Sequence, residues 1–63
     1  MEMDFTKLSI GEQLRMKRLS QRKSQSDIAK ELGINRTYIS FYELGRLTVT
    51  AEHKEKLNSY INA

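Results

Sequence analysis

A break of three residues between two helical patterns constrains this chain more than any other feature of its sequence. Apolar residues at helical spacing stop at Gly33, and a second pattern begins only two residues later, at Asn35. Glycine can take the left-handed conformation that ends a helix, and asparagine is a good N-cap. We therefore predict a sharp corner that fixes the angle between two helices. A helix needs such a fixed angle when it must project into a partner.

Two further helix starts are marked by capping boxes. Ser9 with Glu12, and Ser24 with Asp27, have the spacing at which each side chain satisfies a backbone N–H at the start of a helix. The first helix is predicted to run over about 10–21, and the second to begin after Ser24.

The remaining helices follow from glycine and threonine positions. The third helix is predicted over 36–44, before Gly45, and the fourth begins after Thr50. The expected core consists of Ile10, Leu14, Ile28, Ala29, Leu32, Ile34, Ile39, Tyr42, Leu57 and Ile61. Because the chain has no proline and few β-branched runs, we predict an all-α fold. It is a compact bundle of four short helices, or five if the last residues form another turn.

The residue types that are missing exclude several kinds of site. Without cysteine there is no disulfide and no thiolate ligand, and the single His53 is expected at the surface. No nucleophile–base–orienter set and no Gly-rich phosphate loop is apparent, so we predict no enzyme activity, no cofactor and no metal. No apolar run approaches the ~20 residues of a membrane span, and no signal peptide is apparent. We expect a soluble, cytoplasmic protein without a membrane partner.

Positive charge is concentrated near the end of the first helix. Five basic residues lie within nine positions that contain no acid: Arg15, Lys17, Arg18, Arg22 and Lys23. Such a patch can bind phosphates, and it can equally be the solvated face of a helix. The net charge of +3 does not decide between these two interpretations.

The corner belongs to a longer pattern. A helix-turn-helix needs a small residue, a permissive turn residue and then apolar anchors, and Ala29, Gly33, Ile39 and Tyr42 follow in this order. On the stretches "IGEQLRMKR" and "SQSDIAKELGINRTYISFYELG", the sequence resembles the Cro–repressor (XRE-type) helix-turn-helix domains of phage and bacterial regulators. The resemblance covers most of the chain.

This resemblance implies a lambda-repressor-like domain over residues 9–63, behind an N-terminal arm at residues 1–8. In the family, the second helix of the motif enters the major groove of DNA. Three positions depart from the family pattern. Lys23 and Lys54 replace apolar residues, and their methylene stems are expected to lie along the core. Leu44 replaces a more usual polar residue, which argues against a side-chain phosphate contact there.

Four residues of the third helix are predicted to read base edges, because they face outward when the apolar anchors face the core. They are Arg36, Thr37, Ser40 and Phe41. The planar fork of Arg36 can bond O6 and N7 of guanine together. Thr37 and Ser40 can meet a base, and Phe41 can contact thymine methyl groups. Phe41 has two other interpretations, an ordinary exposed apolar residue or an anchor for a protein partner.

Six further residues are candidates for contacts with DNA phosphates: Gln25, Asn35, Tyr38, Arg46, Arg15 and Lys23. The role of Gln25 comes from the resemblance, in which a glutamine at the start of the second helix contacts a phosphate. For Asn35, helix capping is the surer role. The Tyr38 hydroxyl is expected to bond a phosphate, or its ring to pack against the arm.

The resemblance also implies a structural pair between Arg18 and Glu43, which joins the first helix to the end of the third. The helix dipole supports this pairing independently, because a carboxylate near a helix C-terminus is unfavourable without a nearby cation. Two unrelated surface charges are the alternative.

Two function hypotheses follow. The first is a sequence-specific, double-stranded DNA-binding regulator of transcription, a repressor of phage or mobile-element type. It would bind an inverted-repeat operator as a homodimer, with half-sites about 10 bp apart, and a protein antagonist is a further partner. The alternative is a small protein-interaction module, an antitoxin, antirepressor or adaptor, anchored by Phe41 and Tyr38. A gel shift separates the two, because DNA complexes weaken steeply with salt.

Overall fold

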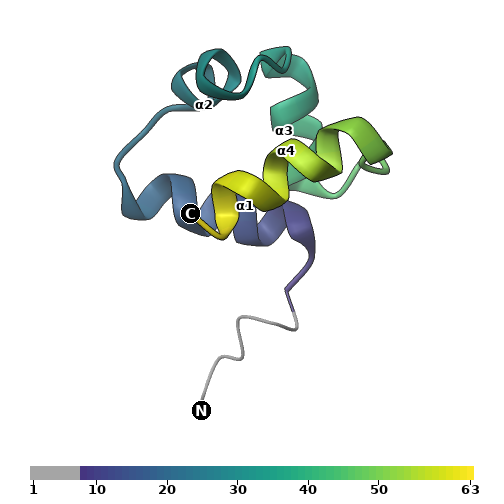
Figure 1. Cartoon of the computed structure of the whole chain (residues 1–63), viewed down its shortest axis with the longest axis horizontal. Coiled ribbons are helices and arrows are strands. Elements are labelled where there is room, and N and C mark those ends of the chain that lie inside the picture. The colour runs from purple at the N-terminus through teal and green to yellow at the C-terminus, as the bar shows by residue number, and fades with distance from the viewer. Residues whose placement is uncertain (1–7) are drawn as a thin grey trace.

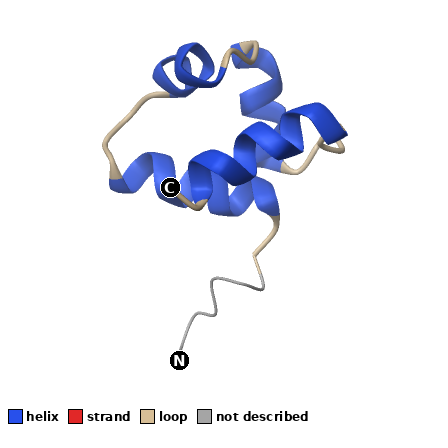
Figure 2. Ribbon diagram, viewed as in Figure 1, coloured by secondary structure: helices blue, strands red, loops and turns tan. Residues whose placement is uncertain are grey.

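The computed structural model describes residues 8–63, which form four helices and no strand (Figures 1 and 2). The helices are α1 (Ile10–Ser20), α2 (Gln25–Leu32), α3 (Arg36–Leu44) and α4 (Ala51–Ile61). The prediction of an all-α bundle of four short helices is confirmed. α1 ends one residue earlier than expected, with Gln21 as its C-cap. Within the described residues, no fifth helix follows α4.

The predicted N-terminal arm lies outside the described residues, apart from its last member, Leu8. The carbonyl of Leu8 accepts a hydrogen bond of 2.8 Å from Nε2 of Gln13, one turn into α1. This contact sets the direction from which the chain enters the first helix.

Both predicted capping boxes are present. The Ser9 hydroxyl accepts from the backbone of Glu12 at 3.2 Å, and the Glu12 carboxylate accepts from the backbone of Ser9 at 3.3 Å. Ser24 and Asp27 make the same two bonds, both at 3.0 Å. Because the ionised carboxylate accepts the backbone N–H of Ser24, the pKa of Asp27 is held below its ordinary value. Local hydrogen bonding therefore defines where α1 and α2 begin.

The corner between α2 and α3 has the predicted chemistry. Gly33 lies in the left-handed region with φ 68° and ψ 34°, a conformation that costs glycine little. The buried Ile34 donates its backbone N–H to the carbonyl of Ala29 at 3.0 Å. Asn35 then caps α3, its Oδ1 accepting from the backbone of Thr37 at 2.8 Å. The two helices are thus joined by a turn with its own hydrogen bonds and its own core residue.

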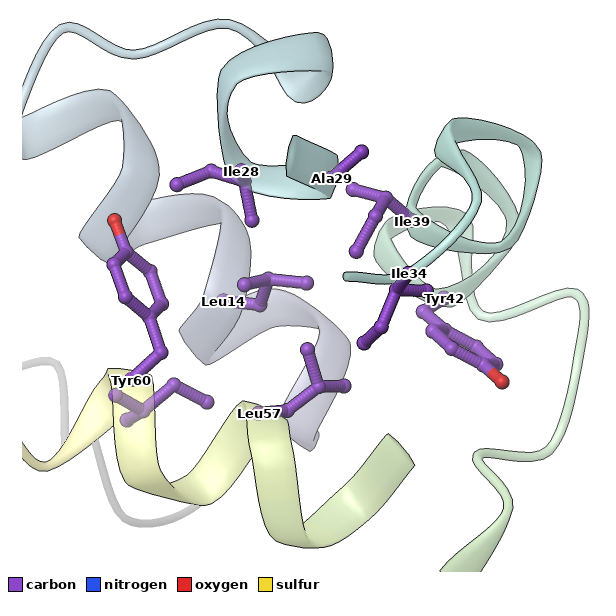
Figure 3. Packing of buried hydrophobic residues seen from close by; sticks show 9 residues of the cluster. Leu14, Ile28, Ala29, Ile34, Ile39, Tyr42, Leu57 and Tyr60 are labelled. Atoms are coloured by element: carbon purple, nitrogen blue, oxygen red, sulfur yellow. The ribbon is translucent and has the colours of Figure 1, made fainter. Parts of the chain in front are cut away.

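One core holds the four helices together. α1 packs against α3 and α4, and α2 packs against α3 (Figure 1). Figure 3 shows Leu14 of α1 between Ile28 of α2 and Leu57 of α4, and all three are fully buried. The buried apolar residues are Leu14, Ile28, Ala29, Ile34, Ile39, Tyr42, Leu57, Tyr60 and Ile61. The expected members Ile10 and Leu32 are only partly buried at the edge of this cluster.

Gly11 marks a close approach of α1 and α3, and the sequence analysis did not single it out. A Cβ placed on Gly11 would lie 1.8 Å from the carbonyl oxygen of Tyr42 in α3. No side chain therefore fits between α1 and α3 at this point. The backbone of α1 itself fixes the position of α3.

Tyr60 of α4 is a second core residue that the sequence analysis missed. Its ring is buried, and its hydroxyl donates a hydrogen bond to the side chain of Gln21 at the end of α1. Removal from water raises the pKa of Tyr60 above its ordinary value. Lys23 lies 5.8 Å from the centre of the same ring, as a cation–π contact requires.

The two lysines that replace apolar residues of the family behave differently. Lys23 is half-buried beside Tyr60, as expected from its long stem. The same expectation is wrong for Lys54, which is exposed. Because Tyr60 is buried in addition to Leu57 and Ile61, the buried stripe of α4 turns away from Lys54. That lysine lies at the edge of the stripe rather than within it.

Candidate nucleic-acid interface

The outward face of α3 brings the four predicted base-reading residues together. Ile39 and Tyr42 bind this helix to the core, and the opposite side carries the exposed Thr37 and Phe41, with the exposed Arg36 beside them in the first turn. With Ser40 and Gln25, these three residues line a shallow hollow of about 220 Å³ between α3 and the start of α2. The 3.6-residue period of a helix explains why the buried residues and the outward residues lie on different sides of α3.

A network of charge-assisted hydrogen bonds lies directly behind this face. The guanidinium of Arg18 donates from Nε to Glu43 Oε2 at 2.8 Å and from Nη2 to Glu43 Oε1 at 2.9 Å. Its third nitrogen, Nη1, donates to the carbonyl of Lys23 at 2.9 Å. The side chains of Arg18 and Glu43 are 11% and 3% exposed. Hydrogen bonding to Glu43 raises the pKa of Arg18 above its ordinary value.

Gln25 connects the network to the exposed hollow. Its Nε2 donates to Glu43 Oε1 at 3.2 Å, so a single carboxylate accepts from α1 and from α2. A side-chain amide has two N–H donors and one acceptor oxygen, so this bond does not use up its capacity. The sequence analysis did not foresee the bond between Gln25 and Glu43, which depends on the angle at which α2 and α3 cross. It fixes the orientation of Gln25 at the edge of the hollow.

The other candidates for phosphate contacts lie in different surroundings. Asn35 and Arg46 are exposed at the two ends of α3. Arg15 lines a second hollow of about 230 Å³, together with Gln25, Ser40 and Leu44. The structure does not bring Lys23 into either hollow. Its ammonium bonds Glu31 at 2.8 Å, on the far side of the network.

Tyr38 and His53 form an aromatic cluster with Tyr42 at the side of α3. The centre of the Tyr38 ring lies 6.1 Å from that of Tyr42 and 5.4 Å from that of His53. Among the described residues, Tyr38 therefore packs against α4. The alternative that its ring packs against the arm concerns residues outside the described part of the chain. The expectation that His53 is merely a surface residue is wrong. It is half-buried, and its Nδ1 lies 2.7 Å from the Tyr42 hydroxyl. These two groups form a hydrogen bond between α3 and α4.

The described residues show few features of other site types. No group of three or more His, Cys, Asp or Glu residues in residues 8–63 is placed to hold a metal ion. No helix in this part of the chain is long and apolar enough to cross a membrane. The arrangement that stands out is the exposed face of α3 with an arginine at each end, behind which lies the buried Arg18–Glu43 ion pair.

Comparison with known proteins gives one match. A family model described as helix-turn-helix matches residues 14–62, which cover α2, the corner, α3, α4 and most of α1. Neither the curated proteins nor the solved structures contain a match to this chain.

Proposed function

Because the chain belongs to the helix-turn-helix family, of the Cro/repressor (XRE) type, and is a DNA-binding regulator, we propose that it represses transcription by placing α3 in the major groove of an operator. The single observation that carries this proposal is the shared hollow on α3. Residues from the start of α2 and from the outward face of α3 meet there, where a duplex can contact both elements.

Charge supports the same face. Arg36 and Arg46 are exposed at the two ends of α3, and Arg15 lies beside its C-terminal half. The one acid of this helix, Glu43, is buried and paired with Arg18. A polyanion that approaches this face therefore meets positively charged side chains, and it meets no unpaired carboxylate from α3.

The contacts divide into two classes. Arg36 and its neighbours Thr37, Ser40 and Phe41 would read base edges, and a bidentate bond from Arg36 to guanine is worth about 1–3 kcal/mol of discrimination. The phosphate contacts would come from Gln25, Asn35, Tyr38, Arg46 and Arg15. Such contacts fix the register of the protein on the duplex without reading sequence. Lys23 is a weaker candidate, because its ammonium is already paired with Glu31.

An inverted-repeat operator bound by two copies is the arrangement that suits a small domain of this kind. One copy reads only a few base pairs, so a homodimer on half-sites about 10 bp apart would supply the missing specificity. A phage or mobile-element switch, controlled by concentration or by a protein antagonist, would fit such a protein.

Selection from a random oligonucleotide pool, followed by gel shifts, tests the proposal. We expect one enriched motif with two-fold symmetry, bound with an affinity that falls steeply as salt rises. Arg36→Ala should weaken binding to that motif about 5–150-fold, the equivalent of about 1–3 kcal/mol, and leave the melting temperature unchanged. Lys54→Ala is the matched control, because it removes one exposed charge from α4, outside both hollows. Failure to enrich any motif, with no retarded complex at low salt, would refute the proposal and favour a protein-interaction module.

A further inference from the structure

A groove of about 350 Å³ lies between the start of α1 and the loop that joins α3 to α4 (Figure 1). It is larger than either of the two hollows beside α3. Ile10, Leu47 and Val49 form its apolar wall. Among the described residues that line it, Arg46 is the one with a charged side chain. We call this feature the α1–loop groove.

The fold leaves the apolar wall of the α1–loop groove only partly covered. Ile10 and Val49 pack against the edge of the core and are partly buried. Leu47 is 41% exposed and belongs neither to the core cluster nor to the residues packed against it. Apolar surface from two separate parts of the chain therefore meets in one concave place, which suits a short apolar segment.

The N-terminal segment is attached at the edge of this groove. Ser9 and Ile10, where the chain enters α1, belong to its lining. Residues 1–7 directly precede this point and lie outside the described part of the chain. Four residues of extended chain span at most about 14 Å, so Phe5 can reach the groove from Ser9. Because the segment is tethered, its effective concentration is high, and a small groove is enough to bind it.

The sequence of the segment matches the chemistry of the groove. Met3 and Phe5 alternate with Glu2 and Asp4. Alternate side chains of an extended chain point to opposite sides, so a bound segment would have one apolar side and one acidic side. The apolar side would contact the apolar wall. The acids would remain close to the long side chain of Arg46, which carries the opposite charge.

We infer that the α1–loop groove binds residues 3–5 of the chain's own N-terminal segment, and that the bound segment shields Arg46. A second copy fits the groove less well, because a two-fold contact through it would bring two Arg46 side chains together. Since Arg46 is a candidate phosphate contact, the segment competes with DNA for this side chain. The competition rests on the proposed function, and the binding of the segment does not.

Nuclear Overhauser spectra of the full chain without DNA test the binding directly. We expect contacts between the ring protons of Phe5 and the methyl groups of Ile10 or Val49. A mixed sample of labelled and unlabelled chains decides whether these contacts lie within one chain. The inference is overturned if Phe5 shows no contact with the groove, or if the contacts arise only between chains.

Thermal melts of variants measure how much the bound segment stabilises the fold. Phe5→Ala should lower the midpoint of unfolding by about 4–8 °C. Leu47→Ala should also lower it, and the two changes together should cost less than the sum of the separate losses, because they remove the same contact. Leu19→Ala is the matched control, since Leu19 is exposed on α1 and lies outside the groove. A midpoint that Phe5→Ala does not change contradicts the inference.

Gel shifts with the selected operator test the shielding of Arg46. Replacing both acids, by Glu2→Gln with Asp4→Asn, should raise the affinity at low salt about two- to five-fold more than a control pair does. The control pair is Glu52→Gln with Glu55→Gln, which removes the same charge from exposed positions of α4. In an Arg46→Ala background the additional gain should vanish. Equal gains for the two pairs would reveal a general effect of net charge and overturn the shielding.

The results distinguish the inference from the proposed function. A chain that binds its operator but shows no contact between Phe5 and the groove overturns the inference and leaves the DNA-binding function intact. If no operator is enriched, the proposed function fails. The spectra and the melts, which need no DNA, then still decide whether the groove binds the segment.

Discussion

Glu43→Ala is the substitution whose effect the structure determines best. It removes the acceptor of three hydrogen bonds, two from Arg18 at 2.8 and 2.9 Å and one from Gln25 at 3.2 Å. The guanidinium of Arg18 would keep its bond to the carbonyl of Lys23 but lose its counter-charge, in a place where the side chain is only 11% exposed. Removing one partner of a buried ion pair costs about 3–5 kcal/mol.

That loss is large for a chain of 63 residues. At about 0.05–0.15 kcal/mol per residue, the whole free energy of unfolding is about 3–9 kcal/mol. Each kcal/mol shifts the midpoint of thermal unfolding by about 4–8 °C in a domain of this size, so the expected drop is about 12 °C or more. The substitution should therefore remove between about one third and all of the stability of the fold.

Circular dichroism during heating and urea titration measures this effect, and two further variants complete the design. Glu31→Ala is the control, because its 2.8 Å bond to Lys23 is exposed and screened by water, so its loss should be barely measurable. Combining Arg18→Met with Glu43→Leu should recover most of the stability, since no unpaired buried charge remains. If Glu43→Ala costs less than about 1 kcal/mol, the pair behaves as an ordinary surface ion pair and the reasoning is refuted.

Three other changes test the fold and its pH dependence. Gly11→Ala should lower the free energy of unfolding by about 2 kcal/mol or more in urea titration. Its Cβ would meet the Tyr42 carbonyl oxygen at 1.8 Å, and this overpacking outweighs the roughly 1 kcal/mol that alanine gains in a helix; an unchanged midpoint would contradict this. Arg22→Gly should leave stability unchanged or raise it by up to about 1 kcal/mol in thermal melts, because Arg22 has φ 56°. A clear loss would indicate a contact of its side chain. The lowered pKa of Asp27 means that its bonds to Ser24 stabilise the fold above the ordinary pKa and are lost as pH falls through the lowered value. Asp27→Asn should therefore make the midpoint of thermal unfolding less dependent on pH below about 4, and an unaltered pH profile would refute this.

Local signals account for most of what the sequence predicts correctly. Capping boxes at Ser9 and Ser24 and the left-handed Gly33 depend on residues within four positions of one another, so they can be read without knowing the fold. The helical period likewise separates the buried Ile39 from the outward Thr37 and Phe41. These signals place the elements and the face that carries the candidate site.

Contacts between distant elements account for what was missed. The bond between Gln25 and Glu43 and the hydrogen bond between Tyr42 and His53 depend on crossing angles that no local pattern encodes. Gly11 had a signal, a glycine inside a predicted helix, which is unfavourable unless something approaches closely. Tyr60 had one too, because it lies three residues from Leu57 on α4.

The close contact at Gly11 has a consequence for how new specificities can arise. Because α3 is positioned through its backbone and its inner residues, the outward residues, such as Arg36, Thr37 and Phe41, do not hold the helix in place. Substitutions there can change which operator is bound while the bundle keeps its shape. Related regulators could diverge in their targets through a few codons, and an engineered library of this helix should yield mostly folded proteins.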